Sequence, residues 1–561
     1  MARTPSSGQD AARFDVAIVG SGVAGALIAW RLALAGLRVG LIEAGAAIDR
    51  AAGAARFRAS LIQTPDSAYE EQPWAPWPRV SSKNEYYVQS GDPATDFQST
   101  YLRAIGGTTW HWLGSMIRLL PSDFELRTRF GVGIDWPISY ADLEPWYLDG
   151  ERQLGVAGDD AYDLGSPRSA GYPQPPIPPT YSDRIFKARC EPLGLPVVPT
   201  PQARNSTEYE GRPPCCGNAQ CIPICPIGAK YDASVHVGAA VARGVALLSE
   251  LVAVAGEIDA VGNVARIRCR RPDRSEQTVE ARVFVVACNA IETAKLLLMS
   301  RTGALPNGVA NSSDQVGRNL ADHPIKLSIA TADQPVYPYR SPLATSGIES
   351  LRDGDFRSNR SAFRIEIGND GWSWPGLDPL GLAREMIAGG RAGASLWNGV
   401  HDQTPTQIRG GSLCEQLPDP THRVEPAWDD LDAIGGPRPR LTFGIDPYTR
   451  KGLDEAATVH DRIFDAMGAT YRLHVGQWQG AGHLMGTHRM GTDPKTSVTD
   501  GFGRTHDHPN LFLAGAGLFP TTGTANPTAT VAALALRSAA AIERDFNVSA
   551  PDATPVAAGS A

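Results

Sequence analysis

A chain of 561 residues exceeds the length over which one hydrophobic core usually grows, so we expect two structural domains. With 42% hydrophobic and 20% charged residues, its composition is that of an ordinary soluble globular enzyme. The formal net charge is −8 and the Lys and Arg residues are scattered, which argues against a nucleic-acid-binding protein.

The amino-terminal stretch 1–14 is short and polar, without the apolar core of a signal peptide and without a twin arginine. No apolar run approaches the ~20 residues that a membrane-spanning helix needs. We therefore expect that the chain neither exports nor anchors itself.

The first predicted elements form a βαβ unit. The apolar run 15–19 predicts a buried parallel strand, residues 26–34 predict a helix, and 37–42 predict a second strand that ends at Glu43. The glycine-rich segment 20–25 (GSGVAG) joins the first strand to the helix, as in dinucleotide-binding folds.

Each glycine of this segment has an expected role. Gly20 would form the tight turn, Gly22 would allow a pyrophosphate to approach closely, and Gly25 would let the helix pack on the strand. Glu43 follows Gly25 by 18 residues, where its carboxylate can bind ribose hydroxyls. The motif alone does not distinguish FAD from NAD.

Four of the eight cysteines crowd into residues 215–225. The run is Cys215 or Cys216, then Cys221, then Cys225 followed by a proline, a spacing that favours iron–sulfur ligation. Zinc usually takes two separated cysteine pairs, and adjacent cysteines would make a strained disulfide, yet both alternatives stay open.

Further along the chain, alternating residues predict strands over 245–256 and 263–270, and 283–287 predicts a buried strand. The stretch 334–420 shows poor periodicity, so no substrate contact can be predicted there. The proline-rich segment 166–180 is interpreted as a connecting segment.

The carboxyl-terminal part combines two histidines with a strand and a long apolar helix. Residues 482–491 contain His483 and His488, 510–515 predict a strand, and the helix starts near residue 528. Pro527 suits the first helical position, which makes Asn526 the expected N-cap.

Five ordered segments resemble the glucose–methanol–choline (GMC) oxidoreductase family over nearly the whole chain. They are the glycine-rich segment 20–25 and the segments 106–112 (GGTTWHW), 135–147 (DWPISYADLEPWY), 288–300 (CNAIETAKLLLMS) and 317–324 (GRNLADHP). The resemblance implies an α/β fold (α+β overall), with a Rossmann-like FAD-binding domain and a sheet-and-helix substrate domain.

The implied FAD-binding domain is discontinuous (12–118, 236–325 and 505–546). The substrate domain would comprise 119–200 and 326–504. The cysteine-rich iron–sulfur insert (205–235) and a disordered tail (547–561) would be separate from both domains. The residues expected to bind FAD are Gly20, Gly22, Gly25, Glu43, Gly106, Gly107, Thr108, Gly517 and Thr528.

By motif, His483 and Asn526 correspond to the pair that meets the substrate hydroxyl in that family. A neutral imidazole can accept the hydroxyl proton while the hydride leaves for the flavin, and Asn526 can hold the same oxygen by hydrogen bond. His488 matches a non-catalytic position, so we expect a structural role. The start of the last helix would stabilise negative charge on a reduced flavin.

The cysteine segment and residues 229–232 (AKYD) resemble an insert in a membrane-associated bacterial subgroup, the large subunits of FAD-dependent glucose, fructose, sorbitol and gluconate dehydrogenases. There the insert holds a [3Fe–4S] cluster, which implies Cys215, Cys221 and Cys225 as ligands; one sequence does not decide firmly between Cys215 and Cys216. The resemblance also implies a multihaem cytochrome c subunit, a small subunit that supplies export, and a periplasmic location at the inner membrane through these partners, with the cytoplasm as the alternative.

The expected function is therefore an FAD-dependent dehydrogenase of a sugar, polyol or sugar acid that passes electrons through the cluster to an external acceptor. A glycoside 3-dehydrogenase with the same parts, an FAD alcohol oxidase with structural cysteines, and a flavin-binding electron-transfer or assembly protein are the alternatives.

Overall fold

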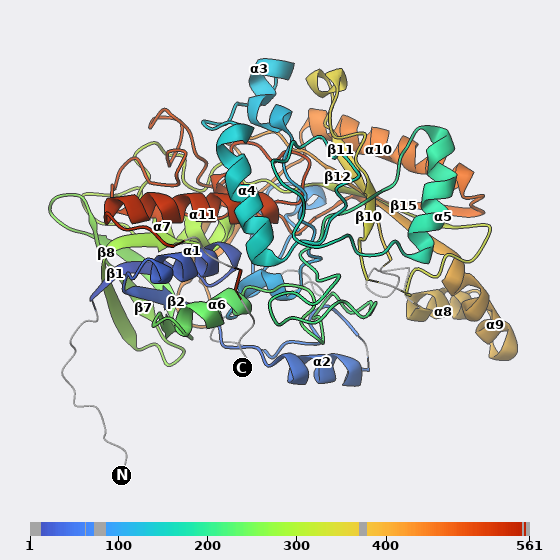
Figure 1. Cartoon of the computed structure of the whole chain (residues 1–561), viewed down its shortest axis with the longest axis horizontal. Helices are drawn as coiled ribbons and strands as arrows, with labels where there is room; N and C mark the ends of the chain where they lie inside the picture. Colours follow the sequence, from blue (N-terminus) through green and yellow to red (C-terminus); the bar gives the residue numbers. More distant parts are fainter. Residues whose placement is uncertain are drawn as a thin grey trace, which may run out of the picture.

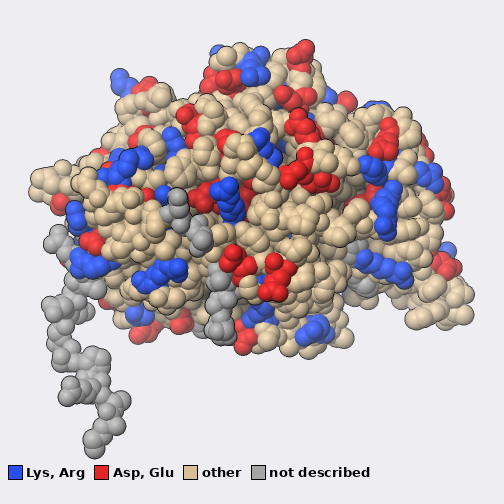
Figure 2. Space-filling view, viewed as in Figure 1, with Lys and Arg blue, Asp and Glu red and all other residues tan. Residues whose placement is uncertain are grey.

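The computed structural model describes residues 13–61, 63–71, 86–340, 342–369, 379–551 and 555–556. Two large sheets stand side by side in the elongated molecule, with helices packed on their outer faces (Figure 1). On the face seen in Figure 2, acidic and basic side chains are interspersed.

The first sheet has the strand order β5-β2-β1-β8-β7-β6, and β16 pairs with the end of β8. Its strands are β1 Arg13–Val19, β2 Val39–Ile42, β5 Ala246–Leu248, β6 Val252–Ile258, β7 Val264–Arg270, β8 Glu276–Val286 and β16 Leu511–Leu513. The strands β5, β2, β1, β8 and β16 run parallel, as in a Rossmann-like sheet, and β6 and β7 form an antiparallel extension. The predicted α/β fold is confirmed.

Two boundaries in this sheet differ from the prediction. The stretch 245–256 is two strands, because Glu250 has a left-handed backbone (φ 52°) that breaks the extended chain between β5 and β6. The strand predicted at 283–287 begins earlier, at Glu276, since the first half of β8 pairs with the half-exposed β7 and so shows no continuous apolar run.

The second sheet is antiparallel, in the order β15-β9-β12-β11-β10-β4. Its strands are β15 Tyr471–Gln479, β9 Ile325–Thr331, β12 Gln407–Cys414, β11 Phe363–Ile367, β10 Ser346–Ile348 and β4 Val198–Pro199. A small third sheet joins β13 Arg423–Leu431, β14 Pro437–Thr442 and β3 Val88–Ser90. The strands of the first two sheets fall almost entirely into the two predicted sets of segments, which supports that domain division; the division itself remains a proposal.

Helices α1 (Val23–Leu34), α4 (Tyr140–Leu154) and α11 (Thr528–Asp545) lie against one another beside the first sheet (Figure 1). α11 is rich in alanine and almost wholly buried. Small side chains let it approach its neighbours closely: a Cβ added to Gly150 of α4 would lie 3.2 Å from that of Ala532. The apolar stretch after Thr528 thus forms a packed core helix.

The other helices are α2 Arg50–Ala59, α3 Leu126–Phe130, α5 Tyr181–Cys190, α6 Ser234–Val241, α7 Ala290–Met299, α8 Pro379–Ala388, α9 Gly393–Gln403 and α10 Pro447–Ala466. Short 3-10 turns are η1 Pro93–Thr95, η2 Gly107–Trp110, η3 Pro121–Glu125, η4 Glu191–Leu193, η5 Asp355–Ser358, η6 Thr404–Thr406 and η7 Ala516–Leu518. α10 packs on β9, β12 and β15 and covers one face of the second sheet. Among the described helices, none is long and apolar enough to cross a membrane.

In the tail predicted to be disordered, residues 552–554 and 557–561 lie outside the described residues. Val556 is only 8% exposed and packs into the main hydrophobic cluster. One apolar side chain of this tail thus finds a buried place on the folded chain, and the disordered tail stays a prediction.

Candidate active site

A cavity of about 1850 Å³ reaches from the glycine-rich segment at the start of α1 to the second sheet. Its wall includes the carboxyl ends of the parallel strands β1 and β2, where ligands of open α/β sheets bind. Most sites for one small ligand measure ~300–1,000 Å³. The cavity therefore has room for a large cofactor together with a substrate.

The three glycines of the βαβ unit take the positions that their roles require. Gly20 has φ +100°, and a Cβ on it would lie 2.6 Å from the Ala287 carbonyl oxygen. A Cβ on Gly25 would lie 1.9 Å from the carbonyl oxygen of Gly20, so the helix could not pack there. A Cβ on Gly22 would meet nothing within 4 Å, because this residue lines the cavity.

Glu43 lies at the end of β2 in the cavity wall, only 6% exposed. Its carboxylate accepts hydrogen bonds from the Ser21 N–H (3.0 Å), the Ser21 hydroxyl (2.7 Å) and the Gly45 N–H (2.9 Å). Burial raises its pKa, and these hydrogen bonds oppose the rise. A carboxylate has about four acceptor positions, so it can still bind a ribose hydroxyl.

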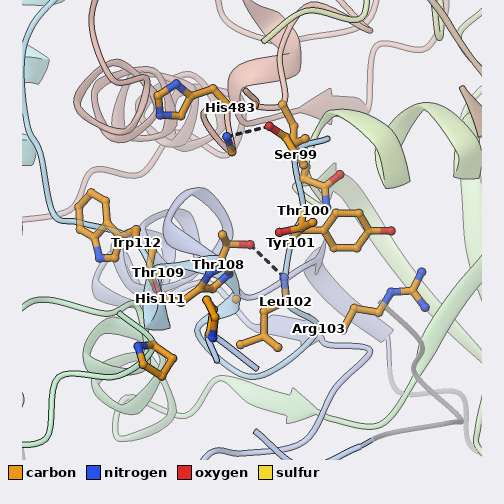
Figure 3. A pocket seen from close by; sticks show the side chains of 18 of the residues that line it. Ser99, Thr100, Tyr101, Leu102, Arg103, Thr108, Thr109, His111, Trp112 and His483 are labelled. Carbon is orange, nitrogen blue, oxygen red and sulfur yellow. Dashed lines mark hydrogen bonds between the residues drawn. The ribbon is translucent and has the colours of Figure 1, made fainter. Parts of the chain in front are cut away.

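The segment 106–112 crosses the glycine turn of the βαβ unit. A Cβ on Gly107 would lie 3.1 Å from the Gly22 Cα, and the Thr108 hydroxyl accepts a hydrogen bond from the Leu102 N–H (3.2 Å; Figure 3). Gly107 and Thr108 line the cavity, whereas Gly106 lies behind them and donates from its N–H to Ser21.

His483 lines the cavity across from the segment 99–103 (Figure 3). Its Nδ1 lies 2.8 Å from the Nδ1 of His323, and its N–H donates to a carboxylate oxygen of Asp322 (3.1 Å). Burial, with His323 and Arg364 nearby, holds the pKa of His483 well below its usual value. A neutral imidazole that can accept a proton therefore faces the cavity at neutral pH.

His488, the second histidine of the motif, is completely buried and does not line the cavity. A Cβ on Gly517 would lie 1.9 Å from the His488 ring, so this glycine makes room for the histidine. Gly517 is itself absent from the cavity wall, unlike Gly515 and Ala516. The missing side chain of Gly517 thus serves packing against His488, and its contact with the cofactor stays a prediction.

Asn526 lines the cavity just before α11, together with Pro527 and Thr528. The predicted N-cap is wrong: the helix starts at Thr528, Pro527 occupies the cap position, and no side chain caps the helix. Instead, the Asn526 side-chain oxygen accepts a hydrogen bond from Arg364 (3.3 Å). Its amide N–H groups are thereby left for a ligand, and the positive end of α11 adjoins the same space.

The second sheet supplies a charged floor that the sequence did not reveal. Glu366 on β11 and Arg409 on β12 line the cavity, with 3.8 Å between their charged groups, and Gln479 ends β15 beside them. Gly411 leaves this part of the sheet open. Arg384 of α8 also lines the cavity. These residues lie in or beyond the stretch whose periodicity was too poor to interpret.

The cysteine run forms a loop with no helix or regular strand, and its four cysteines surround a second, small cavity of about 10 Å³. Cys221 and Cys225 are buried, Cys215 is partly buried and Cys216 is exposed; all eight cysteines are free thiols. In the described ranges, no three His, Cys, Asp or Glu side chains are grouped so that they could hold a metal ion.

This loop separates the small cavity from the large one, since Asn218 and Gln220 line both. Lys230, buried just after the loop, donates hydrogen bonds to the carbonyls of Trp110 and Trp112. Arg50 donates to the Cys225 carbonyl (3.0 Å) and pairs with Asp232. The cysteine loop is thus fixed to the segment that crosses the glycine turn.

Comparison with known proteins agrees with this geometry. The profile described as GMC oxidoreductase matches residues 174–325 and 423–535, and one described as FAD dependent oxidoreductase matches 15–152. The fructose dehydrogenase large subunit of Gluconobacter japonicus is 38% identical over 547 residues, which cover 95% of this chain and 98% of that protein. The chain belongs to the GMC oxidoreductase family.

Two further comparisons agree, one with a relative in sequence and one with a solved structure of the same fold. Paromamine 6'-oxidase of Streptomyces fradiae is 32% identical over 561 residues, covering 95% of this chain and 92% of the relative. Pyridoxine 4-oxidase of Mesorbium loti has the same fold, with a TM-score of 0.63 at 20% identity over 95% of this chain and 99% of that one. The protein is an FAD-dependent GMC oxidoreductase that acts on alcohol groups, as the sequence predicted.

The cavity fits FAD. Its wall includes Gly22, whose Cβ position is free of protein atoms, the buried carboxylate of Glu43 and the start of helix α11. We predict that Gly22→Ala leaves the fold intact, because Gly22 has an ordinary φ of −65° and its Cβ meets no protein atom. The methyl group would instead crowd the pyrophosphate. An overpacking cost of ~1–3 kcal/mol corresponds to about 5- to 150-fold weaker FAD binding.

Calorimetric titration of the apoprotein with FAD measures this loss, and the melting temperature of the apoprotein reports folding. Gly238→Ala is the matched control, since its Cβ also meets nothing but lies on α6, outside the cavity wall. Equal FAD affinity of the Gly22→Ala and wild-type proteins would show that the pyrophosphate does not pass over Gly22.

Proposed function

We propose that the chain is the flavin-bearing subunit of a dehydrogenase that oxidises a carbinol of a sugar, polyol or sugar acid. The observation that carries this proposal is the pair His483 and Asn526, which face one cavity with opposite hydrogen-bonding capacity. FAD, when bound, would accept the hydride from the carbinol carbon. The protein would receive the hydroxyl proton, so an alcohol becomes a carbonyl compound with the loss of one hydride and one proton.

His483 acts as the proton acceptor, because its lowered pKa keeps the ring neutral. Asn526 donates a hydrogen bond to the same substrate oxygen as that oxygen gains negative character. Arg364 holds the amide oxygen of Asn526 and so prevents the amide from turning its acceptor toward the substrate. The two side chains together orient one alcohol group.

A polyhydroxylated substrate suits the floor of the cavity. Glu366 accepts hydrogen bonds, Arg409 donates them and Gln479 does both, a set that can bind several hydroxyl groups at once. The similarity to the fructose dehydrogenase large subunit and to paromamine 6'-oxidase, both named for sugar-like compounds, supports the same substrate class.

We further propose that Cys215, Cys221 and Cys225 hold a [3Fe–4S] cluster that passes single electrons to an external acceptor such as a multihaem cytochrome c. What supports this proposal is the type of donor: these thiols line one small cavity and Cys216 is exposed, although the described side chains are not grouped closely enough to hold a metal ion without a rearrangement of the loop. The cavity has to widen to admit a cluster; the loop can do so without breaking a helix or sheet strand. A small subunit for export and a periplasmic location through these partners belong to the same proposal.

The cluster ligands can be tested in a matched pair of variants. We expect Cys215→Ser to lose the EPR signal of the oxidised cluster and most of the bound iron, while Cys216→Ser keeps both. FAD content, read from absorbance, should stay unchanged in each variant because neither cysteine lines the large cavity. Loss of the EPR signal in the Cys216→Ser variant alone would make Cys216, and not Cys215, the cluster ligand. A wild-type protein without iron would refute the cluster.

The whole proposal is tested by anaerobic titration of the purified protein with fructose, sorbitol, gluconate and a methyl glycoside, following flavin absorbance and EPR together. Bleaching of the flavin by one of them, followed by reduction of the cluster, is the expected result. Failure of every polyol to bleach the flavin would refute the function. The specific alternative is an alcohol oxidase with structural cysteines, favoured by the identity to paromamine 6'-oxidase; hydrogen peroxide formed in air as fast as a dye is reduced would establish it.

A further inference from the structure

His323 stands directly behind the proposed proton acceptor, in a position that no motif assigned to catalysis. It is completely buried, and it is not part of the cavity wall. Its ring meets that of His483 edge to face, with 5.0 Å between the centroids and an angle of 88° between the planes. The shortest link is the 2.8 Å contact between the two Nδ1 atoms.

One of the two Nδ1 atoms has to carry the hydrogen that lies between them. The hydrogen bond at the Nε2 of His323 decides which of the two it is. The Nε2 of His323 lies 2.9 Å from the carbonyl oxygen of Gly523. A carbonyl oxygen can only accept a hydrogen bond, so Nε2 carries a hydrogen. Burial lowers the pKa of His323 to about 4, so at neutral pH the ring has only that one N–H.

The Nδ1 of His323 is therefore an acceptor, and the hydrogen in the contact belongs to His483. A neutral His483 with its hydrogen on Nδ1 has a free electron pair on Nε2. Among the described residues, Nε2 of His483 has no hydrogen-bond partner, and the residue lines the cavity. Nε2 is thus the nitrogen that is left to accept a substrate proton.

We propose that His323 is a positioning residue that fixes the tautomer of His483 through the chain Gly523 carbonyl, His323, His483. The inference rests on the proposed function, and it adds a group that never touches substrate or cofactor. Isolated imidazole favours the opposite tautomer, with the hydrogen on Nε2, which would turn a donor toward the substrate hydroxyl. The buried acceptor behind His483 reverses that preference.

The backbone around the pair supports the same arrangement. Asp322 accepts hydrogen bonds from the N–H groups of His323 (2.7 Å) and His483 (3.1 Å), so one carboxylate holds both main chains. Ser99 bonds to this carboxylate and accepts a hydrogen bond from the Gly482 N–H (2.7 Å). The two rings are therefore held at a fixed separation from both sides.

The test compares His323→Leu with His323→Gln in the holoenzyme, using stopped-flow flavin reduction by the polyol that bleaches the wild-type flavin. Leucine removes both hydrogen bonds, and we expect the limiting rate constant to fall at least ~10-fold while the substrate Kd changes little. Glutamine can donate to Gly523 from its amide nitrogen and accept from His483 on its oxygen, so it should restore the rate to within about threefold.

His508→Leu is the control for a purely structural loss. This histidine is also buried, contacts the Ala310 N–H and the Gly262 carbonyl, and lies outside the cavity wall. We expect it to lower the melting temperature as much as His323→Leu without slowing flavin reduction. Equal rates in the His323→Leu and wild-type proteins, or slowing by glutamine as strong as by leucine, would overturn the proposal.

A spectroscopic readout separates this inference from the proposed function. In ¹⁵N-histidine-labelled protein, the His483 signals, identified by their loss in His483→Gln, should show a protonated Nδ1 and an unprotonated Nε2. In His323→Leu this pattern should reverse. A wild-type protein with the predicted tautomer whose flavin no polyol reduces would refute the function alone; a protonated Nε2 in a wild-type enzyme that turns over would refute the role of His323 alone.

Discussion

Replacing His483 by alanine is expected to slow flavin reduction by about 10²- to 10⁴-fold, the usual contribution of a general base. FAD binding should persist, because the hydrogen bonds of His483 are to His323 and Asp322 and not to the glycine turn of α1 or to Glu43. The measurement is anaerobic stopped-flow reduction by the best polyol, with bound FAD counted from absorbance. His401→Ala is a matched control, since His401 lies exposed on α9.

The pH dependence follows from the same residue. His483 has to be neutral to accept a proton, and its pKa is lowered by burial and by its neighbours His323 and Arg364. The reduction rate should therefore stay constant as the pH falls through ~6.5, the usual histidine value, and decrease only at a lower pH. Near-normal rates in His483→Ala would show that another group takes the proton. A loss of rate near pH 7 in the wild type would instead indicate Asp322, since burial raises the pKa of this carboxyl to about 7 and it accepts a hydrogen bond from the His483 N–H.

Asn526→Ala is expected to reduce the rate of flavin reduction by about 10²- to 10³-fold, as for loss of one donor to a developing oxyanion. Asn526→Asp should be at least as slow, because a carboxylate beside Arg364 keeps its charge and repels the substrate oxygen. Asn526→His should recover part of the rate, since an imidazole N–H can again donate. If flavin reduction had the same rate in all three variants, Asn526 would not act as a hydrogen-bond donor to the substrate oxygen.

The parts that could be predicted from the sequence depend on local spacing. The glycines of the βαβ unit, the buried strand β1 and the motif around His483 each occupy one short segment, so their structural setting follows from the chain itself. Gly517 shows what local spacing does not reveal: its lack of a side chain makes room for the buried ring of His488.

The second sheet was expected from the family resemblance, but its strands could not be located from the local pattern, for a physical reason. Every residue of β12 is buried, because α10 covers one face and the charged floor of the cavity occupies the other. A strand buried on both faces has no polar–apolar alternation, and here it also carries Arg409 and two glycines. His323 was within a recognised motif, but its meeting with His483 joins positions 160 residues apart, which spacing cannot show.

The glycine turn expected to bind FAD and the charged floor of the cavity lie on different sheets, which has a consequence for the evolution of such enzymes. The glycine turn belongs to the first sheet, whereas Glu366, Arg409 and Gly411 stand on adjacent strands of the second. Changes at Arg409 and Gly411 can therefore alter the floor without touching the glycine turn, whereas a change at Glu366 also removes an ion pair of Arg364, which holds Asn526. One ancestral enzyme could in this way give rise to descendants that oxidise different substrates. A small library of variants at these three floor positions would test that divergence in the laboratory.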